Sequence, residues 1–453
     1  MDVAAQIVED IKRGETKKLE FKGMLPENHV KFLKTAVAFS NGIGGKILFG
    51  VNDDGTVAGI PDETIFAIKD SITNSVIDSC EPQIVPDIFI VTVDGKSVIV
   101  LQVSPGLNCP YYLKSEGRIR GTYIRVGATS VLARRENLKA LELRGNKVSF
   151  DSLERPSMKV DDDVLETLRE YLSQYKGEKT LGNLIAMGVV KDTSSGYIAT
   201  NAYALLTANP FKYATVKCAR FRGTDDTVFV DRKEFDGSIL DQATDALDFI
   251  INHINVGAKI DDLVREDIFE IPKDALREAV VNALIHRDYL LEGRSITIFI
   301  FDDRVEIESP GQPLGIDADD ILSGRSVVRN EVIAAVFKSI GLFESYGTGI
   351  RRIVKSCKAA GLPEPQFIED GEYFKVLFRR NPTLLNPKTK RDQADAIIHV
   401  IADNGSLSQA QISNASGVPL SRVKKIMAEL QKEGVIERIG SRRDASWKIC
   451  ERS

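Results

Sequence analysis

Apolar and polar residues follow regular patterns in the first 150 positions. Residues 4–13 predict a charged helix, and the alternation over 18–22 predicts a half-buried strand. Helical spacing over 30–39 ends at Asn41-Gly42, which is typical of a helix C-terminus. Further strands are expected at 45–51, 56–60, 88–93, 97–103 and 121–126, with a hairpin turn at 52–55. These patterns predict one α/β unit, in which 46–51 can pair beside 18–22.

The middle of the chain predicts a small helical segment followed by a mixed α/β layer fold. Residues 163–206 favour two helices and then a short hairpin around 192–196. Helical patterns follow at 239–253 and 273–286. Strands are expected at 215–221, 295–301, 304–307 and 373–378. Such an order is typical of helices packed on a sheet.

The C-terminal part has the clearest pattern. Two prolines and a basic run over 381–391 have the composition of a linker. Three helices are expected after it, at 395–401, from Ser408 onward and at 420–432, with a tight turn at 416–419. Two strands, 434–439 and 445–449, flank a basic loop. This order predicts a winged helix-turn-helix.

The sequence therefore predicts an α/β multidomain protein. The boundaries that we expect are an N-terminal unit over 1–150, a helical connecting module over 157–210, a central unit over 211–381 and a C-terminal unit over 388–453. A length of 453 residues is enough for several cores of ordinary size.

Composition narrows the function classes. The chain has 60 Lys and Arg against 65 Asp and Glu, a net charge of −5, so any basic surface must be local. The longest apolar runs fall far short of the roughly 18 residues that cross a bilayer, which predicts no membrane partner. The first fifteen residues do not have the pattern of a secretory signal. Five scattered cysteines predict a reduced, cytoplasmic protein without a zinc site. A homo-oligomer stays open.

Basic residues gather in the C-terminal unit. From 388 to 453 there are twelve Lys and Arg against eight Asp and Glu, counted along the sequence. Arg422, Lys424 and Lys425 lie early in the helix that enters the major groove in this motif. Arg442 and Arg443 lie at the expected wing tip. Duplex DNA is therefore the expected partner, and the alternative is a winged domain that contacts protein.

A second motif lies on the helix expected over 273–286. Glu278 and Asn282 are four residues apart, so they project from the same face. A carboxylate that orients a water beside an amide that ligates Mg²⁺ suits nucleotide hydrolysis without a P-loop, and the chain contains no P-loop motif. The pattern Glu-x-x-x-Asn-x-x-x-His, which ends at His286, resembles the GHKL ATPase family over about 270–380.

This resemblance implies roles for particular residues. Asn282 would hold Mg²⁺, Glu278 would be the general base, and His286 completes the nucleotide-binding helix. Gly347 and Gly349 would form the phosphate loop before a helix. ATP and Mg²⁺ are thus the implied cofactors. Where the family has an Asp-x-Gly-x-Gly box, this chain has Glu-Ser-Pro-Gly-Gln-Pro over 308–313, so the other interpretation is a scaffold kept for architecture.

The N-terminal segments 14–22 and 38–55 resemble the Schlafen/AlbA-like domain, a nucleic-acid-associated α/β fold, over about 1–140. In nuclease members of that family three carboxylates bind a metal, and Glu15, Glu20 and Asp53 fall on those positions. The alternative interpretation is that Glu20 faces solvent and that Asp53 is an ordinary turn residue. Basic residues that could contact phosphates are Lys17, Lys18, Lys22, Arg118, Arg120 and Arg125.

Taken together, the three parts predict a nucleic-acid-binding regulator, and the whole arrangement resembles bacterial HTH-type transcriptional regulators with an AlbA-like domain. Its central site, when occupied, would change how the terminal domains bind DNA. The alternative function is a metal-dependent nuclease that uses Glu15, Glu20 and Asp53.

Overall fold

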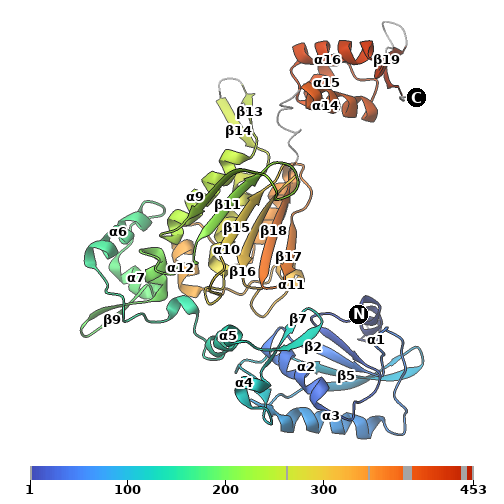
Figure 1. The fold of residues 1–453 in the computed structure, drawn as a ribbon, viewed down its shortest axis with the longest axis vertical. Coiled ribbons are helices and arrows are strands. Elements are labelled where there is room, and N and C mark those ends of the chain that lie inside the picture. Colours follow the sequence, from blue (N-terminus) through green and yellow to red (C-terminus); the bar gives the residue numbers. More distant parts are fainter. Residues whose placement is uncertain (1–2, 262–263, 345–346, 381–389, 440–445, 451–453) are drawn as a thin grey trace.

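The computed structural model describes residues 3–261, 264–344, 347–380, 390–439 and 446–450 (Figure 1). The elements form an N-terminal unit drawn in blue, a larger central unit drawn from green to orange, and a C-terminal unit drawn in red. The α/β multidomain class expected from the sequence is confirmed.

The N-terminal unit is built on a four-stranded sheet. Its order is β1 (Leu19–Lys22), β2 (Gly45–Phe49), β5 (Lys96–Val103) and β4 (Asp87–Val93). Strand β1 lies beside β2 as expected, and the two are parallel. Side chains alternate between the two faces, so Ile47 packs into one core and Leu48 into the other. The core with Ile47 lies under α2 (Val30–Asn41) and α3 (Ile65–Ser79). Ile7 and Ile11 of α1 (Val3–Arg13) pack into the other core.

Smaller elements complete this unit. They are β3 (Cys80–Glu81), β6 (Tyr112–Leu113), α4 (Gly117–Gly121), β7 (Tyr123–Val126), β8 (Thr129–Leu132) and α5 (Arg135–Gly145). The strand expected at 56–60 is wrong: only an isolated bridge joins Val51 to Val57. Gly59 adopts a positive φ of 80°, which interrupts the extended backbone there.

The helical segment shares a core with the central unit. It contains the 3-10 turn η1 (Phe150–Ser152), α6 (Asp162–Ser173), α7 (Leu181–Met187), β9 (Val190–Thr193), β10 (Gly196–Ala199) and α8 (Asn201–Leu206). Leu172, Leu184 and Leu205 are fully buried in the same cluster as Ile333 of the central unit. The segment is therefore part of the central hydrophobic core.

A six-stranded sheet forms the base of the central unit. Its order is β12 (Phe229–Phe235), β11 (Val216–Phe221), β15 (Ile296–Ile300), β16 (Arg304–Pro310), β18 (Tyr373–Arg379) and β17 (Gln366–Asp370). β11 and β15 are parallel, and the other neighbours are antiparallel. The hairpin of β13 (Val256–Asp261) and β14 (Val264–Phe269) lies outside this sheet.

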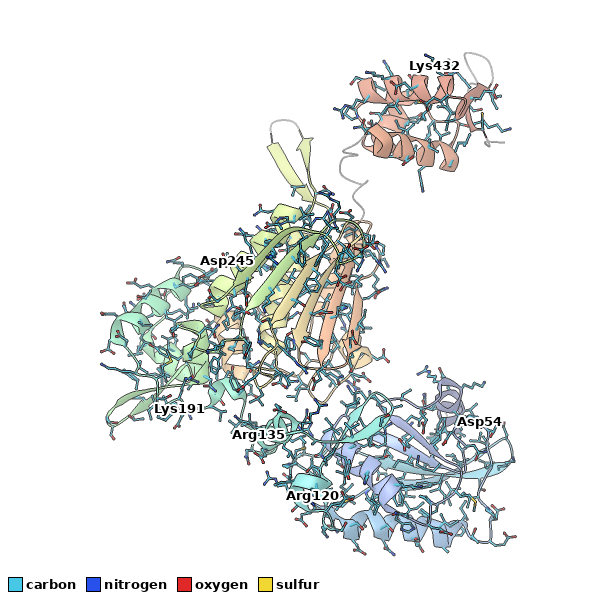
Figure 2. All side chains as sticks on the ribbon, viewed as in Figure 1. Asp54, Arg120, Arg135, Lys191, Asp245 and Lys432 are labelled. Carbon is cyan, nitrogen blue, oxygen red and sulfur yellow. The ribbon has the colours of Figure 1, made fainter. Side chains whose placement is uncertain are left out.

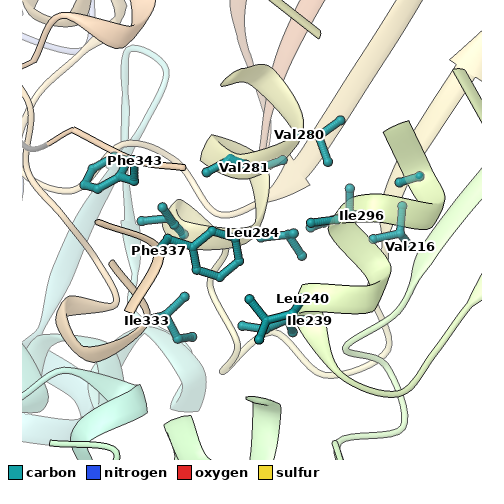
Figure 3. Packing of buried hydrophobic residues seen from close by; sticks show 14 of the residues in the cluster. Val216, Ile239, Leu240, Val280, Val281, Leu284, Ile296, Ile333, Phe337 and Phe343 are labelled. Atoms are coloured by element: carbon teal, nitrogen blue, oxygen red, sulfur yellow. The ribbon is translucent and has the colours of Figure 1, made fainter. Parts of the chain in front are cut away.

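Helices cover the apolar face of that sheet. They are α9 (Ile239–His253), α10 (Lys273–His286), α12 (Glu331–Ser339) and α13 (Gly349–Ala359), with the short α11 (Ala318–Leu322) beside them. Figure 3 shows Leu284 of α10 between Ile296 of the sheet and Phe337 of α12. This packing fixes the position of α10, which carries the candidate site.

The C-terminal unit has its own small core. Helices α14 (Lys390–Asp403), α15 (Gln409–Ser416) and α16 (Leu420–Lys432) pack with the hairpin of β19 (Ile436–Ile439) and β20 (Ser446–Ile449). Ser408 caps α15 through a reciprocal bond with Gln411, as its position in the sequence indicated. The charged side chains labelled in Figure 2, from Asp54 to Lys432, lie exposed on the three units. Within the described residues, no helix has the length and apolarity to span a bilayer.

Candidate nucleotide and nucleic-acid sites

Helix α10 presents the first candidate site. Asn282 Nδ2 donates a hydrogen bond to Glu278 Oε1 at 3.3 Å, so the two side chains share one face as predicted from their spacing. Both residues, together with His286, line a cavity between α10 and the sheet. The walls are largely apolar and include Ala279, Ala283, Ile307, Phe343, Ile353, Phe374 and Val376. Such a cavity, with few polar groups at one end, is typical of a small-molecule site.

The glycine loop closes the polar end of this cavity. Gly347 and Gly349 both line it, and Gly349 is the first residue of α13. A Cβ at Gly349 would overlap Glu278 Oε1, so a larger residue at this position would displace the Glu278 carboxylate. Between the glycines, the hydroxyl Oγ1 of Thr348 is buried and has no hydrogen-bond partner in the described structure. A buried hydroxyl without a partner at a helix N-terminus suits an anionic ligand.

Burial sets the charge states of the site. Burial raises the pKa of Glu278, and the nearby Arg352 guanidinium only partly opposes this effect. Arg352 Nη2 lies 3.5 Å from Glu278 Oε2, and its Nη1 lies 3.0 Å from Glu344 Oε1. Burial lowers the pKa of His286 to about 4, so this imidazole is neutral at pH 7. The site thus pairs a carboxylate of raised pKa with a neutral imidazole.

The segment that replaces the family's Asp-x-Gly-x-Gly box forms a wall of the same cavity. Strand β16 ends at Pro310, and the amide of Gly311 donates to the Glu372 carbonyl at 2.7 Å. Gly311, Gln312 and Pro313 then line the cavity. The region 308–313 therefore borders the same cavity as Glu278 and Asn282, and it carries no aspartate.

The N-terminal carboxylates are not brought together as expected. Glu20 is held by two cations of its own unit, with Arg125 Nη1 at 2.7 Å and Lys22 Nζ at 2.6 Å. Glu15 Oε1 accepts a hydrogen bond from the Phe21 amide at 2.8 Å. Asp53 is exposed in a turn. In the part of the chain that the structure describes, no three His, Cys, Asp or Glu side chains gather as metal ligands.

The predicted metal trio is thus not formed, because internal ion pairs and a backbone bond use the two glutamates. The alternative interpretation of Glu20 is also wrong: its side chain is 13% exposed and faces Arg125 rather than solvent. For Asp53 the turn interpretation agrees with the structure, since the Gly55 amide donates to the Asn52 carbonyl at 2.8 Å.

The C-terminal unit presents three predicted cations on one helix. Arg422, Lys424 and Lys425 are exposed on α16, while Val423 and Ile426 of the same helix are buried. This alternation leaves the charged face of α16 open to a partner. The other two predicted residues, Arg442 and Arg443, lie outside the described residues.

Sequence reasoning missed two contributors to these sites. Arg352 lies one turn into α13 and contacts Glu278 of α10, a contact that no local pattern indicates. Thr348 lies inside the predicted glycine loop, and its position between two glycines was the available signal.

Three family models match separate parts of the chain. "Schlafen, AlbA_2" matches residues 15–134, "Putative ATP-dependent DNA helicase recG C-terminal" matches 293–378, and "Winged helix-turn-helix DNA-binding" matches 396–437. The domain types and their order agree with those expected from the motifs. The central match contains Gly347 and Gly349 but begins after Glu278 and Asn282.

Comparison with solved structures gives matches of low similarity. The DIP2311 protein from Corynebacterium diphtheriae is 16% identical, with 99% of each chain covered and a TM-score of 0.42. The N-terminal domain of a "Putative ATP-dependent DNA Helicase RecG-related Protein" from Nitrosomonas europaea is 23% identical, with 30% of this chain and 94% of that chain covered and a TM-score of 0.23. A search of curated proteins finds no match.

Proposed function

We propose that this protein is a cytoplasmic transcription regulator that binds duplex DNA through its C-terminal unit and ATP with Mg²⁺ through its central unit. The N-terminal AlbA-like unit adds a second nucleic-acid contact. The observation that carries the proposal is the exposed row of Arg422, Lys424 and Lys425 on α16, within the part matched by a winged helix-turn-helix model.

The geometry of α16 supports DNA binding. Its buried side chains, Val423, Ile426, Met427 and Leu430, anchor one face of the helix to the core of its unit. The three cations near its N-terminal end are therefore held on the outer face. In a winged helix-turn-helix this end of the third helix meets the base edges of the major groove, where Arg and Lys favour guanine.

The cavity of the central unit supports nucleotide binding. Gly347 and Gly349 line the cavity at the N-terminus of α13, a position that suits a phosphate group, and the hydroxyl of Thr348 between them is buried without a partner in the described structure. Asn282 offers an amide oxygen beside that position, which would hold Mg²⁺, the ion that neutralises phosphate charge. Glu278, whose pKa is raised by burial, would accept the proton of an attacking water.

A charge-matched substitution tests the DNA assignment. Changing Arg422, Lys424 and Lys425 to Ala removes three cations from α16. The control changes three exposed lysines outside the C-terminal unit, Lys147, Lys212 and Lys358, to Ala. We expect weaker gel-shift binding of duplex DNA for the α16 variant only. The slope of log K against log[salt] should also become less steep, by about 0.9 for each DNA phosphate that the variant no longer neutralises.

Equal binding by the unchanged protein, the α16 variant and the control would contradict DNA recognition by α16. An equal loss in the variant and the control would indicate an effect of net charge, which would also contradict it.

A further inference from the structure

Two lysines of the N-terminal unit reach the central unit. Lys17, just before β1, places its Nζ 2.7 Å from Gln312 Oε1 and 2.7 Å from Glu369 Oε2. The other oxygen of Glu369 accepts a hydrogen bond from the Ala318 amide at 2.9 Å, at the start of α11. One carboxylate therefore joins Lys17 to α11.

The neighbouring Lys18 makes a second connection to the same segment. Its Nζ lies 2.5 Å from Asp317 Oδ2 and 3.3 Å from Asp320 Oδ2. Asp320 Oδ1 in turn pairs with Arg325 Nη1 at 2.7 Å. Burial on its own lowers the pKa of Lys18, but the two aspartates outweigh this effect and raise it. The ammonium group is thus firmly held in its charged form.

The segment that pairs with these lysines also forms one wall of the cavity in the central unit. Residues Gln312, Leu314, Ile316, Ile321 and Arg325 all line the cavity that contains Glu278 and Asn282. We name 312–325 the cover segment. Movement of this segment would change access to the candidate nucleotide site.

The same lysines belong to the basic set of the N-terminal unit. The cations beside them, Lys22 and Arg125, are both paired with Glu20. Lys17 and Lys18 differ because their partners, Asp317, Asp320 and Glu369, come from another unit. A nucleic acid that takes up these two ammonium groups would therefore compete with carboxylates of the central unit.

We infer that Asp317, Asp320 and Glu369 form an autoinhibitory contact that occupies Lys17 and Lys18 in place of nucleic-acid phosphates. Binding of a nucleic-acid strand to the N-terminal unit then releases the cover segment. The effect is reciprocal, so a ligand that moves the cover segment also raises the affinity of the N-terminal unit for nucleic acid. This inference rests on the nucleic-acid contact proposed for that unit.

Neutralising the acidic set tests the competition. The full-length protein carries Arg422, Lys424 and Lys425 changed to Ala, so that the C-terminal unit is silent, and the probe is fluorescent oligo(dT). The test variant adds Asp317→Asn, Asp320→Asn and Glu369→Gln. The control adds three equal changes of charge at ion pairs within single units, Glu9→Gln, Glu154→Gln and Glu166→Gln. We expect the test variant to bind oligo(dT) about fivefold more tightly or better, and the control to bind clearly less tightly than that.

Hydrogen exchange of the cover segment gives an independent readout. Saturating oligo(dT) should speed exchange over 312–325 in the unchanged protein. A variant with Lys17→Gln and Lys18→Gln should exchange quickly already, with no further response to the probe. If the acidic residues only stabilised the fold, hydrogen exchange over 312–325 would not respond to oligo(dT) in this way.

The outcomes separate this inference from the proposed function. Three results would each overturn the autoinhibitory contact. The first is an equal gain in affinity for oligo(dT) in the test and control variants, and the second is no binding of oligo(dT) by any variant. The third is saturation of the unchanged protein with oligo(dT) without a change in hydrogen exchange over 312–325. Retardation of duplex DNA by the protein with an intact α16 tests the proposed function separately. If that fails while the acidic variant still gains affinity for oligo(dT), the autoinhibitory contact stands and the assignment of α16 falls.

Discussion

Gly349 lines the central cavity and brings the start of α13 close to Glu278 of α10. An alanine Cβ at position 349 would meet Glu278 Oε1 and would come within 3.5 Å of Asn282 Nδ2. The side chain of Glu278 would have to move, which would disturb its contacts with Asn282 and Arg352. The steric argument therefore concerns space beside α10 and not backbone conformation.

Thermal unfolding with ATP and Mg²⁺ measures this effect. At a hundred times its dissociation constant, a ligand should stabilise the unchanged protein by about 2.7 kcal/mol. We expect Gly349→Ala and Asn282→Ala to lose most of this gain, whereas Glu278→Gln should keep the gain and stop any turnover. The matched controls are Gly182→Ala in α7 and Asn252→Ala in α9, which lie outside the cavity lining.

Stabilisation that survives in both Gly349→Ala and Asn282→Ala would place the nucleotide elsewhere. Without any stabilisation in the unchanged protein, the central unit would be a scaffold, as the departure over 308–313 also allows.

At the scale of elements, a buried carboxylate joins the helical segment to α12. Asp151 in η1 is fully buried, and its Oδ2 accepts a hydrogen bond from the Ile333 amide at 2.7 Å. Its Oδ1 accepts another from Ser149 Oγ at 2.5 Å. Burial raises the pKa of Asp151 to about 6 despite these bonds. The folded state therefore binds a proton more tightly than the unfolded state does.

This shift predicts a pH dependence with a definite sign. The folded pKa of Asp151, about 6, lies above the ordinary value of 3.8, so the associated stability is present at low pH and is lost as the pH rises through 6. The full loss is about 3 kcal/mol, of which about 1.4 kcal/mol falls between pH 5 and pH 8. Urea unfolding should show that the free energy of unfolding of Asp151→Asn rises relative to that of the unchanged protein from pH 5 to pH 7. Above pH 7 this difference should level off.

The exposed Asp163→Asn in α6 is the control, and its difference from the unchanged protein should not follow this curve. If the difference in free energy of unfolding between Asp151→Asn and the unchanged protein stayed constant from pH 5 to pH 8, this result would contradict the raised pKa of Asp151.

Helices with a strong periodic pattern could be predicted closely from the sequence. The bounds expected for α9, α10 and α16 agree with the structure. Helix α3 was missed although Ile65, Ile72 and Val76 are buried at helical spacing, because exposed apolar residues such as Phe66 weaken the contrast between its two faces. Strand β12 was missed for another reason. Most of its residues are exposed, so its pairing with β11 left no apolar pattern to read.

Some contacts of the candidate site could likewise be predicted from the sequence, and others could not. Glu278 and Asn282 could be predicted as neighbours because one helix turn separates them. The contact of Arg352 with Glu278, and the contacts of Lys17 and Lys18 with the cover segment, join residues far apart in sequence. Charged side chains carry no sequence signal for their partner when the partner lies on another element.

At the scale of the whole molecule, hydrophobic cores divide the described residues into three independent groups. Two clusters belong to the N-terminal unit, and one cluster runs from Leu165 to Phe378 through the helical segment and the central unit. A separate cluster, which includes Ile397, Met427 and Ile436, lies within the C-terminal unit. The helical segment is therefore needed by the central unit, whereas the C-terminal unit buries its own apolar surface.

This division predicts how the protein unfolds. Calorimetry of the full chain should resolve more than one transition, because each core loses its packing by itself. A fragment of residues 388–453 should melt alone at the temperature of one of these transitions. ATP with Mg²⁺ should raise the midpoint of the transition of the central unit and should leave that of the C-terminal unit unchanged, since a ligand stabilises only the state that binds it.

The ion pairs of Lys17 and Lys18 link the N-terminal and central units, so they are a limited exception to the independence of the units. Partly exposed ion pairs contribute about 0 to 1 kcal/mol each, which is too little to merge the transitions of the N-terminal and central units. Neutralising Asp317, Asp320 and Glu369 should therefore shift these two transitions by no more than a few degrees.

Removal of residues 157–210 should instead abolish the central transition, since the shared core would lose Leu172, Leu184 and Leu205. A central unit that unfolds cooperatively without this segment, or a single transition for the whole chain, would contradict the division into cores.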